Sequence, residues 1–280
     1  MITIKKPERI GRRLFTALLS VVTMTGMVGA ASADDAVKKG IEQYREMLQD
    51  ANPAELTVYK GEDLWLAKAG PKQASLEACD LGKGPGVLEG AYAELPRYFA
   101  DTDKVMDAES RIAHCRVTLQ GLSPEEAANK PFGGRGQPQT TNEALVAYVV
   151  EQSRGVTINV PQAHPKEVAA YKRGEKSFFY AAGPYDFSCA TCHAKTGQRI
   201  RLQDLPNLVE PEAAKKAFAS WPAYRVSLGL VKTMQWRMND CFRQQRFPKL
   251  KFGSQTSIDL ITYMGVKAKG GTMNAPALKR

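Results

Sequence analysis

Ser188-Cys189-Ala190-Thr191-Cys192-His193 contains a C-x-x-C-H motif, which is the attachment signal of a c-type haem. Two thiols at this spacing bond to the two vinyl groups of one porphyrin, and the imidazole that follows binds the iron on its proximal side. A redox-active C-x-x-C would require a thioredoxin-like βαβ context, which this sequence does not show. A zinc site would require two further Cys or His ligands at short spacing. The motif therefore predicts one covalent haem c, held by Cys189, Cys192 and His193.

Residues 1–33 have the organisation of a secretory signal peptide. A basic segment is followed by an apolar segment over residues 14–30 and by the small residues Ala31-Ser32-Ala33 of a cleavage site. We expect a mature, soluble chain that begins at Asp34 in the periplasm, with no membrane span in any later segment. Arg12-Arg13 leaves the twin-arginine route open, but attachment of haem after export favours the general secretory route. The basic residues are Lys5, Lys6, Arg9, Arg12 and Arg13.

The composition is that of a globular protein with an anionic partner or substrate. The chain has 280 residues, 43% hydrophobic and 24% charged, which is enough for two domains of ordinary size. The formal net charge is +10, and the five basic residues and one acidic residue of residues 1–33 leave +6 for the mature chain. Nucleic acid is not the expected partner, because the chain is exported and its basic residues are not interleaved with aromatic ones.

Hydrophobic periodicity and turn residues predict a mainly helical chain. We expect an amphipathic entry helix over residues 34–50, a short extended segment over residues 56–66, and a helix over residues 106–120. The sequence Thr140-Thr141-Asn142-Glu143 predicts a capped helix start. In the second half, we expect one helix that carries Trp236 to Cys241 and another that begins after Ser254.

The two halves of the chain resemble each other. Four residues of the first half recur in the second half at a constant spacing of 126, and two more recur at a spacing of 115. Such regularity indicates an ancient duplication. We therefore predict two tandem cytochrome c-like domains, a haem-less one over residues 34–155 and a haem-binding one over residues 156–280. The pairs are Pro96/Pro222, Tyr98/Tyr224, Arg111/Arg237, Cys115/Cys241, Leu145/Leu260 and Tyr148/Tyr263.

The first domain has no C-x-x-C-H motif and cannot hold a c-type haem. Its cysteines are Cys79 and Cys115, and Cys115 is equivalent to Cys241. In an oxidising compartment two such thiols are expected to pair, so we predict a Cys79–Cys115 disulfide. The alternative is two separate buried thiols.

The residues alone leave several candidates for the second axial ligand of the haem iron. Methionine is a common ligand in cytochromes c, while Cys241 also precedes the last helix, where a distal ligand belongs. His164 is expected in a surface loop, and His114 is in the other domain. Seven basic residues and one acidic residue between 221 and 253 are expected to favour a Cys241 thiolate. The other candidates are Met234, Met238, Met264 and Met273.

Arg237 lies one helical turn before Cys241 and could hold an oxyanion. Its alternative role is an ion pair with Asp240, three residues later.

The C-x-x-C-H motif, the paired halves and the segment Trp236-Arg237-Met238-Asn239-Asp240-Cys241-Phe242-Arg243-Gln244-Gln245-Arg246 together resemble the SoxA family, the catalytic cytochrome subunits of the periplasmic thiosulfate-oxidising Sox system. The resemblance covers nearly the whole mature chain. It implies that His193 and Cys241 are the axial ligands, that Cys241 is catalytic and carries a persulfide, and that Arg237 binds the substrate. Many members hold a second haem in the first domain, so this chain resembles the single-haem type.

The resemblance also implies an L-cysteine S-thiosulfotransferase reaction, in which thiosulfate is joined to a cysteine of the carrier protein SoxYZ. Two electrons leave through the haem to SoxX, a monohaem cytochrome c that forms a heterodimer with SoxA. The alternatives are a thiosulfate dehydrogenase that forms tetrathionate, a plain periplasmic electron-transfer cytochrome c, and a structural subunit with an inert haem.

Overall fold

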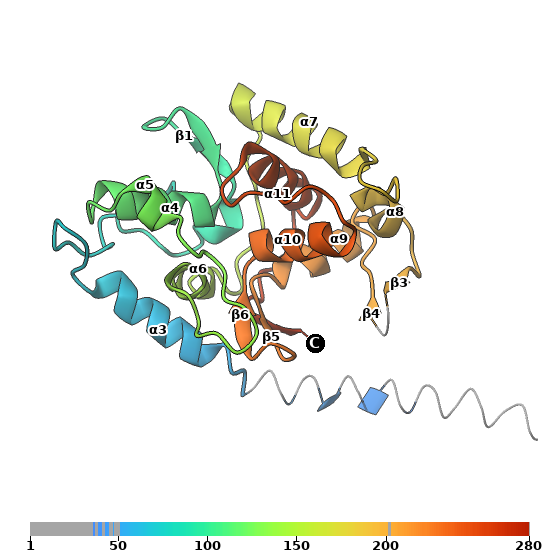
Figure 1. The fold of residues 1–280 in the computed structure, drawn as a ribbon, viewed down its shortest axis with the longest axis horizontal. Coiled ribbons are helices and arrows are strands. Elements are labelled where there is room, and N and C mark those ends of the chain that lie inside the picture. The colour runs from blue at the N-terminus through green and yellow to red at the C-terminus, as the bar shows by residue number, and fades with distance from the viewer. Residues whose placement is uncertain are drawn as a thin grey trace, which may run out of the picture. The chain divides into compact units, whose positions relative to one another are not determined.

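The structure is a computed structural model, and it describes residues 51–200 and 203–279 together with isolated helical positions between 36 and 47. Residues 52–280 form one compact unit (Figure 1). The expected signal peptide and most of the expected entry helix lie outside the described residues. Among those residues, no helix combines the length and the apolar character needed to cross a membrane.

The described residues are mainly helical, with short strands between the helices. In chain order the elements are α3 (Glu55–Leu66), η1 (Tyr92–Glu94), β1 (Arg97–Phe99), β2 (Lys104–Met106), α4 (Ala108–Thr118), α5 (Pro124–Ala127), α6 (Thr141–Glu151), α7 (Pro165–Phe179), α8 (Cys189–His193), β3 (Arg199–Ile200), β4 (Gln203–Asp204), α9 (Pro211–Ala219), β5 (Ala223–Arg225), β6 (Leu230–Lys232), α10 (Met234–Gln244), α11 (Gln255–Lys267) and β7 (Ala277–Lys279).

Helices α3 and α6 form the crossing that organises the first half. The buried residues of α3 are Thr57, Gly61 and Trp65, spaced at four residues, so they lie on one helical face. At Gly61, an added Cβ would lie 2.1 Å from the carbonyl oxygen of Ala144, which shows how closely the two backbones approach. The expectation of an extended segment over residues 56–66 is therefore wrong. The helical spacing of the buried residues outweighs the weak alternation of apolar residues.

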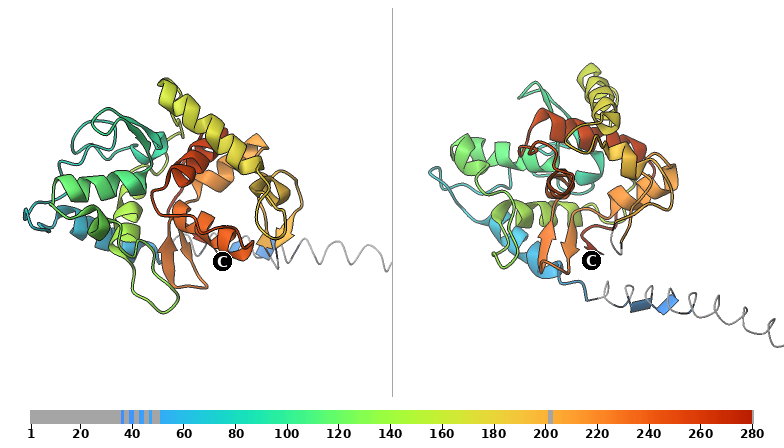
Figure 2. Two further views of the ribbon diagram at one scale, coloured as in Figure 1. Left: turned by 45° about the horizontal axis from the view of Figure 1, so that its top comes forward. Right: turned by 45° about the vertical axis from the view of Figure 1, so that its right-hand side comes forward.

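Helices α7 and α11 repeat this crossing in the second half (Figure 2). At Gly174 of α7, an added Cβ would lie 1.9 Å from the carbonyl oxygen of Asp259 and 2.9 Å from Cβ of Tyr263. In the first crossing, Gly61 meets Ala144 and Tyr148, the residues equivalent to Asp259 and Tyr263. The two halves thus share one helix pair, although the sequence did not lead us to expect α7.

A hairpin followed by a helix is the second repeated unit. Strands β1 and β2 pair Arg97 with Met106, and strands β5 and β6 pair Ala223 with Lys232, which are the same positions displaced by 126. Helices α4 and α10 follow at the same displacement. In the second half, β7 adds a parallel strand to β5.

The two halves meet through equivalent residues. Gln235 is displaced by 126 from Glu109, and its backbone N–H donates to Oε1 of Glu109 (3.1 Å). The Gln235 side chain also donates to Asp107 (2.7 Å). One hydrophobic core runs through both halves, from Trp65 and Val149 to Tyr263. The contact between equivalent positions supports the duplication predicted from the sequence, while the boundary near residue 155 stays a prediction.

The substitution Gly174→Ala is expected to lower the free energy of unfolding by about 2–4 kcal/mol, because the new Cβ would overlap the backbone of α11. Gly134→Ala is the matched control, since the nearest heavy atom to its added Cβ lies 3.6 Å away. Urea unfolding of the haem-loaded protein, followed by circular dichroism, compares the two variants. Equal unfolding midpoints would show that α7 and α11 are not in such close contact in solution.

Candidate haem and substrate site

A cavity of about 1960 Å³ is lined mainly by the second half of the chain, and the site residues predicted from the sequence are part of its lining. The attachment residues Cys189, Cys192 and His193 line it from α8, and Arg237 and Cys241 line it from α10. Several aromatic side chains complete the apolar part of the lining. They are Phe132, Phe178, Phe218, Trp221, Trp236, Phe242, Phe247 and Phe252.

Helix α8 presents the attachment residues. Ser188 is its N-cap and forms a capping box with Thr191, which fixes where the short helix begins. The thiols of Cys189 and Cys192 are free. Burial, followed by the nearby thiol of Cys241, raises the pKa of the Cys189 thiol to about 12.

The imidazole of His193 is prepared to bind a metal. Its Nδ1 lies 2.9 Å from the carbonyl oxygen of Pro206, to which Nδ1–H donates. Burial lowers the pKa of His193, which favours the neutral ring. A neutral imidazole with Nδ1–H bonded to a carbonyl leaves the lone pair of Nε2 available for iron. The cavity, the two free thiols and this ring fit a c-type haem.

Helix α10 places Cys241 on the lining of the same cavity as the attachment residues. Thr233 caps the helix by accepting a hydrogen bond from the N–H of Trp236. Burial raises the pKa of the Cys241 thiol, while Arg237 and Arg225 act in the opposite direction. The expectation that the basic surroundings would favour the thiolate is therefore wrong for the chain alone, because desolvation has the larger effect.

Arg237 forms the ion pair that the sequence offered as its alternative role. Its Nη1 lies 3.2 Å from Oδ2 of Asp240, and Asp240 also accepts from Arg243 (2.7 Å) and Gln244 (2.8 Å). The ion pair does not take Arg237 away from the cavity, which the side chain still lines. The carboxylate of Asp240 thus holds the guanidinium of Arg237 beside Cys241.

Lys232 is one of the seven basic residues between 221 and 253, but its side chain does not line the cavity with Cys241. Its side chain is fully buried, and Nζ lies 2.7 Å from Oε1 of Glu143 in the first half. Nζ also donates to the carbonyl oxygen of Gly133. This pairing could not be predicted from local patterns, because 89 residues separate Lys232 and Glu143.

The other candidate ligands divide into two groups. Met234, Met238 and Met264 line the cavity. Met273 is buried in the hydrophobic core and is not part of the lining. The two remaining histidines are also absent from the lining: His164 caps α7 and stacks on Tyr98, and His114 lies near Asp101 of the first half (3.6 Å).

One wall of the cavity comes from the first half. Residues 130–135, in the loop before α6, line it, and the ring of Phe132 lies edge-on to Phe252 at 5.7 Å. The side chain of Gln139 fixes the end of this loop to β6 by bonding both the N–H and the carbonyl of Val231. The sequence marked this segment only as a Gly/Pro-rich loop, so its contribution to the site was missed.

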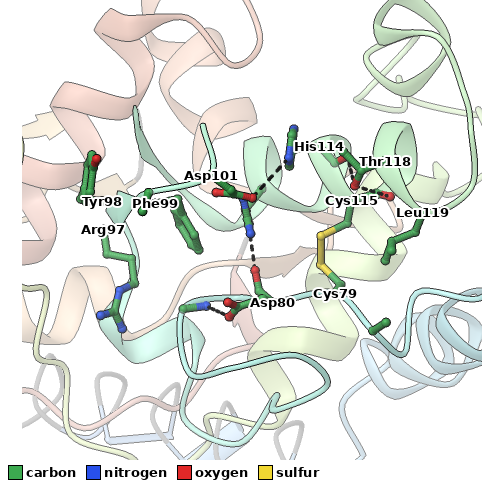
Figure 3. A pocket seen from close by; sticks show the side chains of 14 residues that line it. Cys79, Asp80, Arg97, Tyr98, Phe99, Asp101, His114, Cys115, Thr118 and Leu119 are labelled. Atoms are coloured by element: carbon green, nitrogen blue, oxygen red, sulfur yellow. Dashed lines mark hydrogen bonds and ion pairs between the residues drawn. A yellow bond between two sulfur atoms is a disulfide. The ribbon is translucent and has the colours of Figure 1, made fainter. Parts of the chain in front are cut away.

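The equivalent site of the first half is closed by a disulfide. Cys79 and Cys115 are joined, with an S–S distance of 2.08 Å, which is the predicted pairing. They border a smaller pocket of about 570 Å³ (Figure 3). Arg111, the equivalent of Arg237, has its guanidinium 4.0 Å from the ring centroid of Phe99 and bonds Asp101 through both carboxylate oxygens. In this half the arginine is therefore engaged by the protein itself.

The chain is similar in sequence and in fold to known proteins. The family model described as "SoxA/TsdA, cytochrome c domain" matches residues 60–158 and 173–273. The L-cysteine S-thiosulfotransferase subunit SoxA of Hydrogenophilus thermoluteolus is 48% identical over 94% of this chain and 97% of its own length. A subunit of the same name from Hydrogenobacter thermophilus is 31% identical over 94% of this chain and 96% of its own length. The crystal structure of SoxXA from P. pantotrophus has a similar fold, with a TM-score of 0.70 and 24% identity over 85% of this chain and 84% of that chain.

Proposed function

The chain belongs to the SoxA family of cytochrome c subunits, and from this membership we propose that it is the catalytic subunit of an L-cysteine S-thiosulfotransferase. In the proposed reaction a sulfur–sulfur bond joins thiosulfate to a cysteine of the carrier protein SoxYZ. The S–H bond of the carrier thiol breaks, one proton and two electrons leave, and the product is a cysteine S-thiosulfonate. Of its two cytochrome c domains, the second, residues 156–280, carries the site in this proposal.

The position of Cys241 carries the proposal. In the first half, the equivalent Cys115 reaches Cys79 closely enough to form a disulfide, with Cα atoms 5.6 Å apart. At the same position of the second half, burial and the nearby groups Asp240 and Cys192 raise the pKa of the Cys241 thiol. A cysteine placed on the distal side of a haem site, beside an arginine, is poorly explained in a plain electron carrier. We therefore propose that Cys241 would hold the haem iron together with His193, and that its sulfur lies where thiosulfate and the carrier cysteine are joined.

The proposed cofactor is one covalent haem c, attached through Cys189 and Cys192, with His193 as the proximal ligand. When bound, the haem supplies an acceptor for the electrons that the reaction releases. The first domain, residues 34–155, holds none, because its two cysteines are spent on the disulfide.

The side chains of the second domain bind and orient the reactants. Arg237 is held by Asp240 (3.2 Å) and presents a guanidinium to the dianionic thiosulfate. The aromatic lining excludes water from the reacting sulfur atoms and strengthens this attraction. The roles of Arg237 and Cys241 explain why the charge and the thiol lie on one face of α10.

The proposed partners are a SoxX-type monohaem cytochrome c, in a heterodimer, and SoxYZ. One relative of known structure comes from a SoxXA complex, which supports the first of these partners. We propose that the protein acts in the periplasm after removal of residues 1–33.

Product analysis of the haem-loaded heterodimer tests this function. With thiosulfate and an electron acceptor, we expect a mass increase on the cysteine of SoxYZ, and no tetrathionate when the carrier is left out. Tetrathionate formed at the same rate with and without SoxYZ would instead identify a thiosulfate dehydrogenase. Electron transfer with neither product would identify a plain cytochrome.

A further inference from the structure

Arg225 is the last residue of β5, and its side chain lines the same cavity as Arg237 and Cys241. Among the residues that the structure describes, Nε of Arg225 is the buried side-chain nitrogen or oxygen that has no hydrogen-bond partner. A buried donor without a partner carries a free-energy cost of desolvation. Such a cost is acceptable at a position where a ligand completes the hydrogen bond.

Comparison of the two halves shows what has changed around this arginine. Displacement by 126 matches Arg225 with Phe99 and Ser227 with Asp101. In the first half, Phe99 lies against the guanidinium of Arg111, and Asp101 neutralises it. In the second half, the aromatic ring is replaced by a second cation and the carboxylate by a hydroxyl, while Ser227 also lines the cavity.

The replacements leave two guanidinium groups near one another. Arg237 lowers the pKa of Arg225, second only to burial, and Asp240 opposes this effect. Asp240 already accepts hydrogen bonds from three side chains, which are Arg237, Arg243 and Gln244. Two cations with one shared carboxylate favour an anion that can accept from both.

We propose that Arg225 is the second guanidinium of the thiosulfate site, and that it binds the sulfonate oxygens together with Arg237. The proposal rests on the proposed function. It explains the unpaired Nε, the loss of the acid at position 227 and the proximity of both arginines to Cys241. A tetrahedral dianion with three sulfonate oxygens offers enough acceptors for two planar guanidinium groups. Arg225 is thereby a binding residue, which the sequence placed only in a basic cluster.

The test compares Arg225→Met and Arg225→Lys with Arg243→Met, in haem-loaded protein. Arg243 is the matched control, because it also bonds Asp240 but its side chain is 73% exposed. We expect Arg225→Met to raise the KM for thiosulfate about 10–100-fold with kcat changed less than about threefold, Arg225→Lys to raise it less, and Arg243→Met to leave it nearly unchanged. Equal KM values for the Met variants at 225 and 243 would overturn the proposal.

Two further measurements separate the possible partners of Arg225. Calorimetric titration with sulfate, an unreactive tetrahedral dianion, is expected to show binding to the unsubstituted protein and to the Arg243→Met variant but about tenfold weaker binding to Arg225→Met. This result would support the anion site even if no thiosulfate transfer to SoxYZ were found. A lower haem content or an altered reduction potential in Arg225→Met, with sulfate affinity and KM unchanged, would assign Arg225 to a haem propionate and refute the proposal. If Arg225→Met does not fold, the Lys variant alone decides, through the same two affinities.

Discussion

Replacement of Cys241 by Ser is expected to lower the rate of thiosulfate transfer to SoxYZ at least about 10³-fold, because a hydroxyl does not replace the thiol beside the reacting sulfur atoms and does not bind iron as a thiolate does. The haem remains attached, since Cys189 and Cys192 are on α8 and Cys241 is on α10. The rate is measured by mass analysis of the carrier, in variants matched for haem content.

The same substitution is expected to change the ligands of the iron. Low-temperature electron paramagnetic resonance of the oxidised protein should show a low-spin signal of His/thiolate type, with a narrow spread of g values, that is lost in Cys241→Ser and Cys241→Met. Met238→Leu and Met264→Leu are the matched controls, because both side chains line the same cavity. If either methionine variant lost the signal while Cys241→Ser kept it, the iron would have a methionine ligand and Cys241 would have no role in coordination.

The haem motif, the duplication and the disulfide could be predicted from the sequence because each depends on residues with a fixed chemical meaning. The spacing of Cys189, Cys192 and His193 has one common use in an exported chain. The displacement of 126 matched Cys115 with Cys241, and the oxidising compartment predicted that Cys115 pairs with Cys79. Local signals were also sufficient for helix starts, since Thr140 and Ser254 cap α6 and α11.

What could not be predicted depends on contacts between distant segments. The weak alternation around residues 56–66 suggested a strand, whereas burial of Gly61 against Ala144 requires a helix. The surroundings of Cys241 were judged from charge alone, whereas burial has the larger effect on its pKa. The loop over residues 130–135 is held at the cavity by distant residues, since Lys232 of β6 and Glu143 of α6 bond the carbonyl and the N–H of Gly133. Neither burial nor such packing can be inferred from the local sequence.

Lys232 and Glu143 are expected to make the largest single contribution to stability among the ion pairs of the described residues. Both side chains are fully buried. The carboxylate also completes the capping box of α6 by accepting from the backbone N–H of Thr140 (3.3 Å), and it accepts from the side chain of Gln139 (2.7 Å). Removing one partner of a buried pair leaves an uncompensated charge, so Lys232→Met is expected to lower the free energy of unfolding by about 3–5 kcal/mol.

The double variant Lys232→Met/Glu143→Gln tests this cause. It removes both charges and keeps an amide oxygen to cap α6, so it is expected to recover most of the stability lost by Lys232→Met. Arg199→Met is the matched control, because the side chains of Arg199 and its partner Asp204 are 60% and 83% exposed and an exposed ion pair contributes about 0–1 kcal/mol. Urea unfolding of haem-loaded protein gives all three values. If Lys232→Met cost no more than Arg199→Met, the ammonium group would be solvated in solution, and it would not hold the loop at Gly133 against the haem cavity.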